Sequence, residues 1–405
     1  MYRHRVQKNS VFIVLRDSTG IIQLVVKDNS KYFKIASKLT IESSIWSKGV
    51  VVEDPRAPGG REIRVEELGI YQLADYFPIT KTASREFLLD VRHLWIRSRK
   101  MNSVLKIRHE VFKAIREFFE KNGYIEVQAP TFITAAVEGG ATLFPVKYFD
   151  KKGVYLTQSA QFYLEALIYS LEKVYTIAPS FRAEKSRTRR HLTEFWHAEA
   201  EAAWTDLNAI LKVQEELVYY IVRKVLDNKT EELSILKRDL DKLEVVRPPF
   251  ERIMYDDVIQ KLQKKGFSIE WGEDLGADEE RALTMEYEEP FFVVGFPEKT
   301  KAFYHKNDPL RPEITLSADL LAPEGYGEII GGGERIDNVK DLVDKIKRFG
   351  LNPKDYQWYI DLRRLGSVPH AGFGLGIDRV VMWLCGLNHI VDAIPFPRTI
   401  RRVYP

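Results

Sequence analysis

The chain has very little cysteine: of its 405 residues, one, Cys385, is a cysteine. This excludes a disulfide framework and a cysteine-based zinc site, because both need several thiols. The sequence also lacks an apolar run of the roughly eighteen residues that span a bilayer, and its N-terminus lacks the apolar region of a signal peptide. These absences predict a soluble protein of a reducing compartment, which we expect in the cytoplasm and away from membranes.

A large excess of one charge is also missing. The chain has 61 Lys and Arg against 58 Asp and Glu, which leaves a formal net charge of +3. So small an excess does not by itself indicate a nucleic-acid-binding protein. The basic residues are unevenly placed, however, because residues 1–40 hold eight Lys and Arg against two Asp, and more follow at 92–108. Such clusters suit a phosphate backbone and equally suit a solvated face, so both alternatives stay open.

Residues 1–78 have the pattern of short strands separated by turns. A helical segment falls between these strands around 32–39, and a turn rich in Pro and Gly falls at 55–60. This arrangement predicts a small OB-type barrel, a fold that presents one sheet face to single-stranded nucleic acid. The strand-like runs are 11–15, 21–26, 47–53 and 62–71.

Phe12 and Gln23 stand out in the predicted barrel because they fall on neighbouring strands. An exposed ring beside an amide could stack on one base and read its edge. A lone Phe in a strand is more commonly a core residue, which is the alternative for Phe12.

Residues 79–102 are a basic linker that leads into a second, larger domain at 103–405. This domain opens with apolar residues at helical spacing between Ser103 and Asn122, where Asn-Gly ends the predicted amphipathic helix. A short strand at 124–127 follows and runs to Pro130. An ordinary surface helix would explain the periodicity equally well.

The stretch 181–204 is dense in charge at its centre and half apolar at both ends, which predicts a β-hairpin with a cationic tip. A basic tip suits a polyphosphate, although a solvated turn is the usual explanation of a charge run. Arg182 lies within the apolar approach, where a guanidinium is costly unless a ligand or carboxylate meets it. That position favours a functional hairpin.

Two further segments carry chemistry. Asp319 and Glu328 are hard oxygen ligands in apolar surroundings, and three glycines at 331–333 let a ligand approach the backbone. Magnesium carrying a nucleotide's phosphates fits two such carboxylates, and an ion pair with a nearby arginine is the alternative. The glycine-rich run 372–376 with Arg379 is a weak signal alone, because the chain lacks the βαβ alternation of a Rossmann fold.

Together these segments resemble the three ordered motifs of class II aminoacyl-tRNA synthetases over nearly the whole chain. The helix and strand ending at Pro130 resemble motif 1, RAEKSRTRRHLTEFWHAE resembles motif 2, and Gly372-x-Gly-x-Gly-x-x-Arg379 resembles motif 3. Motif 2 is most similar to archaeal-type asparaginyl enzymes, close kin of the aspartyl and lysyl enzymes. The resemblance implies an α+β chain with an OB-type anticodon domain and an antiparallel catalytic sheet flanked by helices. It further implies a homodimer that uses ATP, Mg²⁺ and asparagine to charge tRNA(Asn).

The resemblance also implies residue roles in ATP binding. Arg182 would hold the α-phosphate and the amino-acid carboxylate, and Arg379 the γ-phosphate. Asp319 and Glu328 would position Mg-ATP, as the metal ligands. The remaining nucleotide contacts would be Glu184 at the adenine end, His191 at the outer phosphates, Phe195 stacked on adenine, and Gly376. Of all these residues, Arg182, Glu184 and Arg379 are the predicted catalytic residues.

For the amino acid, the resemblance implies Glu138 in a flexible loop, Gln161, Arg182, Glu199 and Arg335. Aspartyl enzymes carry a lysine three residues after the equivalent of Gln161, and this chain has Leu164 there. The resemblance thus favours asparagine over aspartate. An aspartyl enzyme, an asparagine synthetase of the same fold and a catalytically silent tRNA-binding protein are the alternatives.

In the barrel, the resemblance assigns Phe12 and Gln23 to the anticodon. One departure concerns its start, because barrels of this family begin with a further strand before Tyr2 and the present sequence begins almost at that point. Either the start codon of this sequence is misplaced or the barrel lacks its first strand; in the sequence as given, that strand is expected to be missing.

Overall fold

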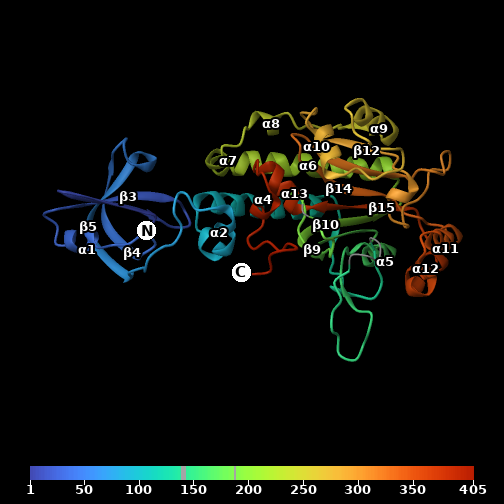
Figure 1. Ribbon diagram of the computed structural model, residues 1–405, viewed down its shortest axis with the longest axis horizontal. Coiled ribbons are helices and arrows are strands. Elements are labelled where there is room, and N and C mark those ends of the chain that lie inside the picture. The colour runs from blue at the N-terminus through green and yellow to red at the C-terminus, as the bar shows by residue number, and fades with distance from the viewer. Residues whose placement is uncertain (138–142, 187) are drawn as a thin grey trace. The chain divides into compact units, whose positions relative to one another are not determined.

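The computed structural model describes residues 1–137, 143–186 and 188–405. These residues form two compact units, Met1–Leu88 and Leu89–Pro405 (Figure 1). The predicted linker 79–102 is divided between the two units. Glu138, a predicted amino-acid ligand, lies outside the described residues. Within the described ranges, no helix is long and apolar enough to cross a membrane.

The first unit is a five-stranded sheet, in the part of the chain described, with the strand order β1-β2-β3-β5-β4. Its core is lined by residues such as Val11, Ile13 and Leu24, which alternate with outward-facing neighbours. The predicted helical segment is the short helix α1 (Phe33–Ser37). The strands are β1 (Arg3–Gln7), β2 (Ser10–Arg16), β3 (Ile21–Lys27), β4 (Ser44–Glu53) and β5 (Arg61–Gln72).

The position of β1 in this unit concerns the prediction that the first strand of the barrel is missing. The first strand of the sheet, β1, begins at Arg3 and pairs with β2 from Arg3↔Val14 to Gln7↔Ser10. Among the described residues of this unit, β1 is thus the first of the five strands along the chain. Whether relatives carry a further strand concerns residues outside this chain, so that expectation stays a prediction.

The second unit is built on a sheet of eight strands, counted over the described ranges, in the order β11-β12-β13-β14-β15-β10-β9-β6. Neighbouring strands run antiparallel except for the outer pairs β11·β12 and β6·β9, which are parallel. A separate two-stranded sheet is formed by β7 (Phe132–Ile133) and β8 (Tyr155–Leu156). The eight strands are β6 (Ile125–Glu126), β9 (Lys173–Phe181), β10 (Glu194–Ala203), β11 (Glu251–Met254), β12 (Phe291–Val294), β13 (Ser317–Ala322), β14 (Gly327–Glu334) and β15 (His370–Gly376).

Helices pack on this sheet, and the predicted amphipathic helix ends next to Asn122 as expected. The predicted amphipathic helix is α4 (Arg99–Lys121); it begins four residues early because the Ser98 side chain accepts a hydrogen bond from Met101 N and caps it. Helices α4, α6 and α13 share one apolar core with the central strands (Figure 1). The other helices are α2 (Arg85–Asp90), α3 (Arg92–Trp95), α5 (Gln161–Leu171), α6 (Leu207–Asn228), α7 (Thr230–Leu236), α8 (Asp241–Glu244), α9 (Tyr255–Lys264), α10 (Ala277–Thr284), α11 (Val339–Arg348), α12 (Gln357–Arg364) and α13 (Ile377–Leu384).

The two faces of strand β10 have different surroundings: one packs in the apolar core and the other lines a pocket. Ala198, Ala200 and Ala202 are buried in the helix-covered core. Because successive side chains of a strand point to opposite faces, Glu199 and Glu201 lie on the other face, where both line a pocket. The alternating acids and alanines of this strand therefore place carboxylates on one face and small apolar groups on the other.

The glycines of β15 make room on that same face. The register pairs Gly372 with Glu201 and Gly374 with Glu199. A Cβ on Gly372 would lie 2.1–2.3 Å from the Glu201 carboxylate group. Gly372 thus makes room for the Glu201 carboxylate. Gly372 and Gly374 are both strand residues, and the helix α13 begins only after Gly376.

Candidate active site

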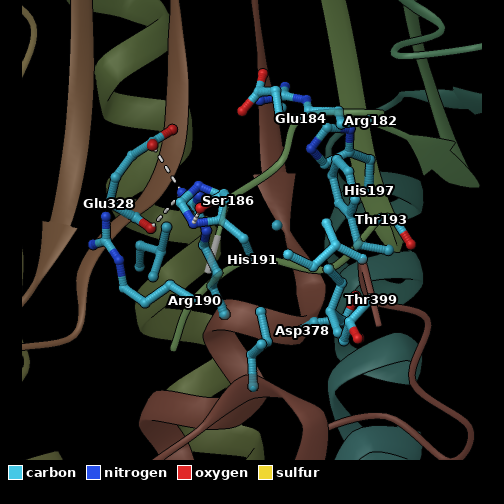
Figure 2. A pocket seen from close by; sticks show the side chains of 18 residues that line it. Arg182, Glu184, Ser186, Arg190, His191, Thr193, His197, Glu328, Asp378 and Thr399 are labelled. Carbon is cyan, nitrogen blue, oxygen red and sulfur yellow. Dashed lines mark hydrogen bonds and ion pairs between the residues drawn. The ribbon is translucent and has the colours of Figure 1, made fainter. Parts of the chain in front are cut away.

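Two adjoining pockets lie over the central strands, and together they contain nearly every predicted site residue. The first pocket is lined by all seven predicted nucleotide ligands, Arg182, Glu184, His191, Phe195, Glu328, Gly376 and Arg379 (Figure 2). The second pocket is lined by the described amino-acid ligands and both predicted metal ligands, Gln161, Arg182, Glu199, Arg335, Asp319 and Glu328. Arg182, His197, Glu328 and Gly374 line both pockets and mark their junction.

The predicted hairpin holds Arg182 at this junction. Strands β9 and β10 pair from Phe181↔Glu194 onward, and Arg182 N donates to Thr193 O at 3.0 Å. The Arg182 guanidinium lies 5.4 Å from the centre of the Phe195 ring. Figure 2 shows Arg182 and His197 together on one side of the first pocket and Glu328 on the other. The Arg182 guanidinium therefore lies between the first and the second pocket, which have different linings.

Opposite Arg182, a second arginine is held by an acid. Arg379 Nη1 donates to Glu328 Oε2 at 2.7 Å and to Glu328 O at 3.0 Å. Burial raises the pKa of Glu328, but Arg379 and Lys301 outweigh it and lower that pKa to about 2. The ion pair with an arginine, which was the alternative to metal binding, is therefore present at Glu328.

His191 and His197 are neutral at physiological pH. Burial, with the nearby cations Arg379 and Arg190, lowers the pKa of His191 to about 4. Burial, with Arg182 and Arg379, lowers the pKa of His197 to about 3. His191 Nδ1 lies 3.1 Å from Ser186 Oγ, so its ring orientation is fixed by the hairpin loop itself.

The depressed pKa of His191 predicts a pH-dependent stability. The unfolded chain binds a proton at His191 below its ordinary pKa of about 6.5, whereas the folded chain binds it only near pH 4. The folded state therefore loses stability as pH falls from about 6.5 toward 4. We expect the drop in urea midpoint between pH 7 and pH 5 to be smaller in His191→Asn than in the unsubstituted protein. The exposed His109 provides the control, and an equal change in His109→Asn would contradict the assignment.

In the second pocket, two acids of β10 have different partners. Glu199 is anchored by the backbone, because Ala160 N donates to its Oε2 at 2.8 Å, and the Ser159 hydroxyl donates to its Oε1. Glu201 instead pairs with Arg335, whose Nη2 donates to Glu201 Oε1 at 2.6 Å. The Arg335 guanidinium also lies 5.2 Å from the centre of the Tyr304 ring. The pocket thus offers one anchored carboxylate and one paired arginine.

Asp319 and Glu328 face the same point of the backbone. A Cβ on Gly331 would lie 3.2 Å from Glu328 Oε1 and 3.3 Å from Asp319 Oδ1. Lys301 Nζ pairs with Asp319 Oδ2 at 2.5 Å, and burial raises the pKa of Asp319 to about 7. No group of three metal-ligating side chains is present among the described residues. Two hard carboxylates fit Mg²⁺ of the kind that is bound chiefly through substrate phosphates.

Eight lining residues of the second pocket come from residues 246–312, a segment rich in acids, Pro and Gly that carries no predicted site residue. Among them, Asp274, Lys301, Tyr304 and His305 have polar or charged side chains that can contact a ligand. The run Lys301-Ala-Phe-Tyr-His305 could have indicated a functional segment, because a lysine stands directly before apolar and aromatic residues. His197, Ser159 and Arg190 were also missed; Arg190 Nη1 pairs with Glu280 Oε2 at 2.5 Å beside the first pocket.

Leu164, the residue at the lysine position of aspartyl enzymes, is fully buried. It packs in an apolar cluster with Ala160, Ile168 and Val174. It contributes no charge to the adjoining second pocket, so the electrostatics of that pocket rest on the acids and arginines described above.

In the first unit, Phe12 and Gln23 share one face of the sheet. The register sets Phe12 opposite Val25 and Val14 opposite Gln23, so these four residues share the sheet face opposite to Val11 and Ile13. On that face Val14 and Val25 are buried, whereas Phe12 and Gln23 are partly exposed. Phe12 is partly exposed, and the Arg5 guanidinium lies 4.8 Å from its ring centre. Gln23 Nε2 donates to Glu62 Oε2 at 2.9 Å. Phe12 does not belong to the buried apolar cluster of this unit, and its role with the anticodon stays a prediction.

Two family models match the chain. Residues 84–400 match the class II tRNA synthetases (D, K and N), and residues 1–71 match the OB-fold nucleic acid binding domain. The asparagine–tRNA ligase of Thermococcus gammatolerans is 56% identical over 407 residues, covering 100% of this chain and 94% of the relative. The asparagine–tRNA ligase of Thermoplasma acidophilum is 52% identical and covers 100% of this chain and 95% of the relative.

Solved structures agree. Asparaginyl-tRNA synthetase from Pyrococcus horikoshii, complexed with asparaginyl-adenylate, superposes with a TM-score of 0.97 at 53% identity, covering 100% of this chain and 94% of that one. The Entamoeba histolytica asparaginyl-tRNA synthetase, also with asparaginyl-adenylate, gives 0.93 at 35% identity, again covering 100% and 94%. The chain therefore belongs to the class II tRNA synthetases for D, K and N and, within them, to the asparagine–tRNA ligases.

Proposed function

We propose that this protein activates asparagine with ATP and transfers it to tRNA(Asn). The observation that carries the proposal is the pair of adjoining pockets that share Arg182 and Glu328. The first pocket suits a nucleotide and the second a small zwitterion with a polar side chain. Substrates in the two pockets would meet at Arg182, where an acyl phosphate bond can form. ATP–pyrophosphate exchange with asparagine tests this function directly.

In the first step, a carboxylate oxygen of asparagine attacks the α-phosphorus of ATP. The new bond joins that oxygen to phosphorus, the bond from the α-phosphorus to the bridging oxygen breaks, and pyrophosphate leaves with the electron pair. Arg182 neutralises charge on the α-phosphate, and Arg379 and His191 hold the departing phosphates. No side-chain nucleophile is needed, because positioning and charge stabilisation supply the rate. The terminal hydroxyl of tRNA then attacks the acyl carbon and releases AMP.

Mg²⁺ would be held by Asp319 and Glu328. When bound, it supplies charge neutralisation for the phosphates of ATP. The chain's own contribution is the pair of carboxylates around Gly331. Lys301 Nζ pairs with Asp319 Oδ2, so this carboxylate also has a cationic partner within the protein.

The outward face of the first unit is the proposed anticodon site, and it yields a test. We expect Phe12→Ala to weaken tRNA binding by about 1 to 3 kcal/mol, because one stacked base is lost. Aminoacylation measured against tRNA concentration should show a higher KM, while ATP–pyrophosphate exchange stays unchanged. Phe149→Ala, which removes an exposed ring from the second unit, is the matched control. An equal loss of exchange and charging in Phe12→Ala would remove this residue from the anticodon site.

A homodimer is part of the same proposal. The support for a homodimer is an exposed apolar surface in the segment that resembles motif 1. The side chains of Ile125 and Phe132, which follow the end of α4, are 46% and 50% exposed. Sedimentation equilibrium is expected to give twice the 47.0 kDa mass of one chain. A monomer at micromolar concentration would contradict this part. The cytoplasmic location likewise stays a prediction.

A further inference from the structure

Next to the second pocket, a carboxylate that does not line it organises a buried network. Glu165 lies one turn after Gln161 on α5 and is fully buried. It accepts hydrogen bonds from Gln161 Nε2 at 2.8 Å and from the Tyr359 hydroxyl at 2.7 Å. His370 Nε2 lies 3.0 Å from its Oε2, and Arg363 forms an ion pair with it. Helix α5 thus meets α12 and β15, two elements of a much later part of the chain, at one anion.

This network keeps Glu165 ionised. Burial alone would raise its pKa, but Arg363 and His370 outweigh burial and hold the pKa of Glu165 well below its usual range. Arg363 is itself fixed, because its Nε donates to Ile336 O at 2.8 Å. An ionised carboxylate can only accept hydrogen bonds.

The amide of Gln161 therefore has one favourable orientation. Its NH₂ group donates to Glu165, and turning the amide over would set its carbonyl oxygen against the Glu165 carboxylate. Because Gln161 lines the second pocket, its carbonyl Oε1 is left as the group for a ligand there. That oxygen accepts hydrogen bonds and repels other acceptors.

We propose that Glu165 is a positioning residue that fixes Gln161 as a hydrogen-bond acceptor for the α-ammonium group of the amino-acid substrate. The inference rests on the proposed function, because it takes asparagine as the ligand of the second pocket. An amide held the other way would present NH₂ to an ammonium group, and two donors cannot pair. Glu165 thereby decides that Gln161 presents a hydrogen-bond acceptor to the second pocket, although Glu165 itself does not contact the substrate.

The test compares asparagine with succinamic acid, which is asparagine without its α-amino group. In Glu165→Gln, residue 165 can also donate, so the Gln161 amide is free to turn. We expect the asparagine KM in ATP–pyrophosphate exchange to rise about 10-fold or more, as for a hydrogen bond to a charged group. The KM for ATP and the inhibition constant of succinamic acid should each stay within about twofold. A parallel weakening of asparagine and succinamic acid would mean a merely structural role and would overturn the proposal.

A second variant covers the chance that Glu165→Gln does not fold, since it leaves Arg363 without its anion. Gln161→Met removes the acceptor and keeps the Glu165–Arg363 pair, and it should show the same selective loss of asparagine. Unchanged asparagine KM in Gln161→Met overturns the proposal. Tyr163→Phe, which changes a hydroxyl on the same helix and keeps the ring stacked on Trp358, is the control. If the unsubstituted protein does not exchange with asparagine, the proposed function fails instead.

Discussion

Replacing Arg182 with alanine is expected to reduce ATP–pyrophosphate exchange by about 10²- to 10³-fold, because a guanidinium is removed from developing phosphate charge. Arg182 is the strongest test because it lines both pockets, and its loss affects the junction where the two substrates meet. The thermal unfolding curve should change little, since the hairpin is held by the backbone pairing of β9 and β10. Exchange kinetics at saturating ATP and asparagine measure the effect.

Arg189→Ala provides the matched control. Arg189 lies in the same loop and is exposed, and it does not belong to the lining of either pocket. Its removal changes the loop's charge by the same amount, so it separates a general electrostatic effect from the specific position of Arg182. If Arg182→Ala keeps near-native exchange while melting normally, Arg182 is not part of the reaction.

The second large effect concerns the choice between asparagine and aspartate. We expect exchange with asparagine and roughly 10⁴-fold less with aspartate, because a site built to pair an amide leaves polar groups unpaired with the wrong substrate. Glu199 is an anchored carboxylate that can accept from an NH₂ group and repels a carboxylate. Arg335 supplies the opposite polarity. The kcat/KM values for the two amino acids measure the discrimination, and comparable values would promote the aspartyl alternative.

Glu199→Gln probes the same selectivity from the protein side. The substitution removes the charge that repels aspartate, so the asparagine-to-aspartate ratio should fall even if both activities drop. Leu164→Lys is the informative comparison. Because Leu164 is fully buried in an apolar cluster, a lysine there would be costly and should lower the unfolding midpoint without creating an aspartate enzyme. If Leu164→Lys alone produced an enzyme that prefers aspartate, the buried position of residue 164 would be contradicted.

Much of this protein follows from its sequence because the signals are local. Alternation in β10 predicts which side chains share a face, and apolar spacing predicts α4, whose start differs only because Ser98 caps it earlier. The resemblance to the class II motifs implied seven nucleotide ligands, and each of them lies in the lining of the first pocket. Arg182 also stood out by its chemistry, because a guanidinium in an apolar strand end needs an anionic partner.

What only the tertiary structure decided is which distant segments meet. The order of strands brings β13 and β14 beside β15 and β10, so Lys301 and Tyr304 from a plain-looking connector enter the second pocket. The same packing gathers Tyr359, Arg363 and His370 around Glu165. The sequence pattern does not predict these contacts, because the residues that meet lie 194 to 205 positions apart in the chain. Such contacts follow from the sheet order and from the need of each buried charge for a partner, and both are properties of the folded chain.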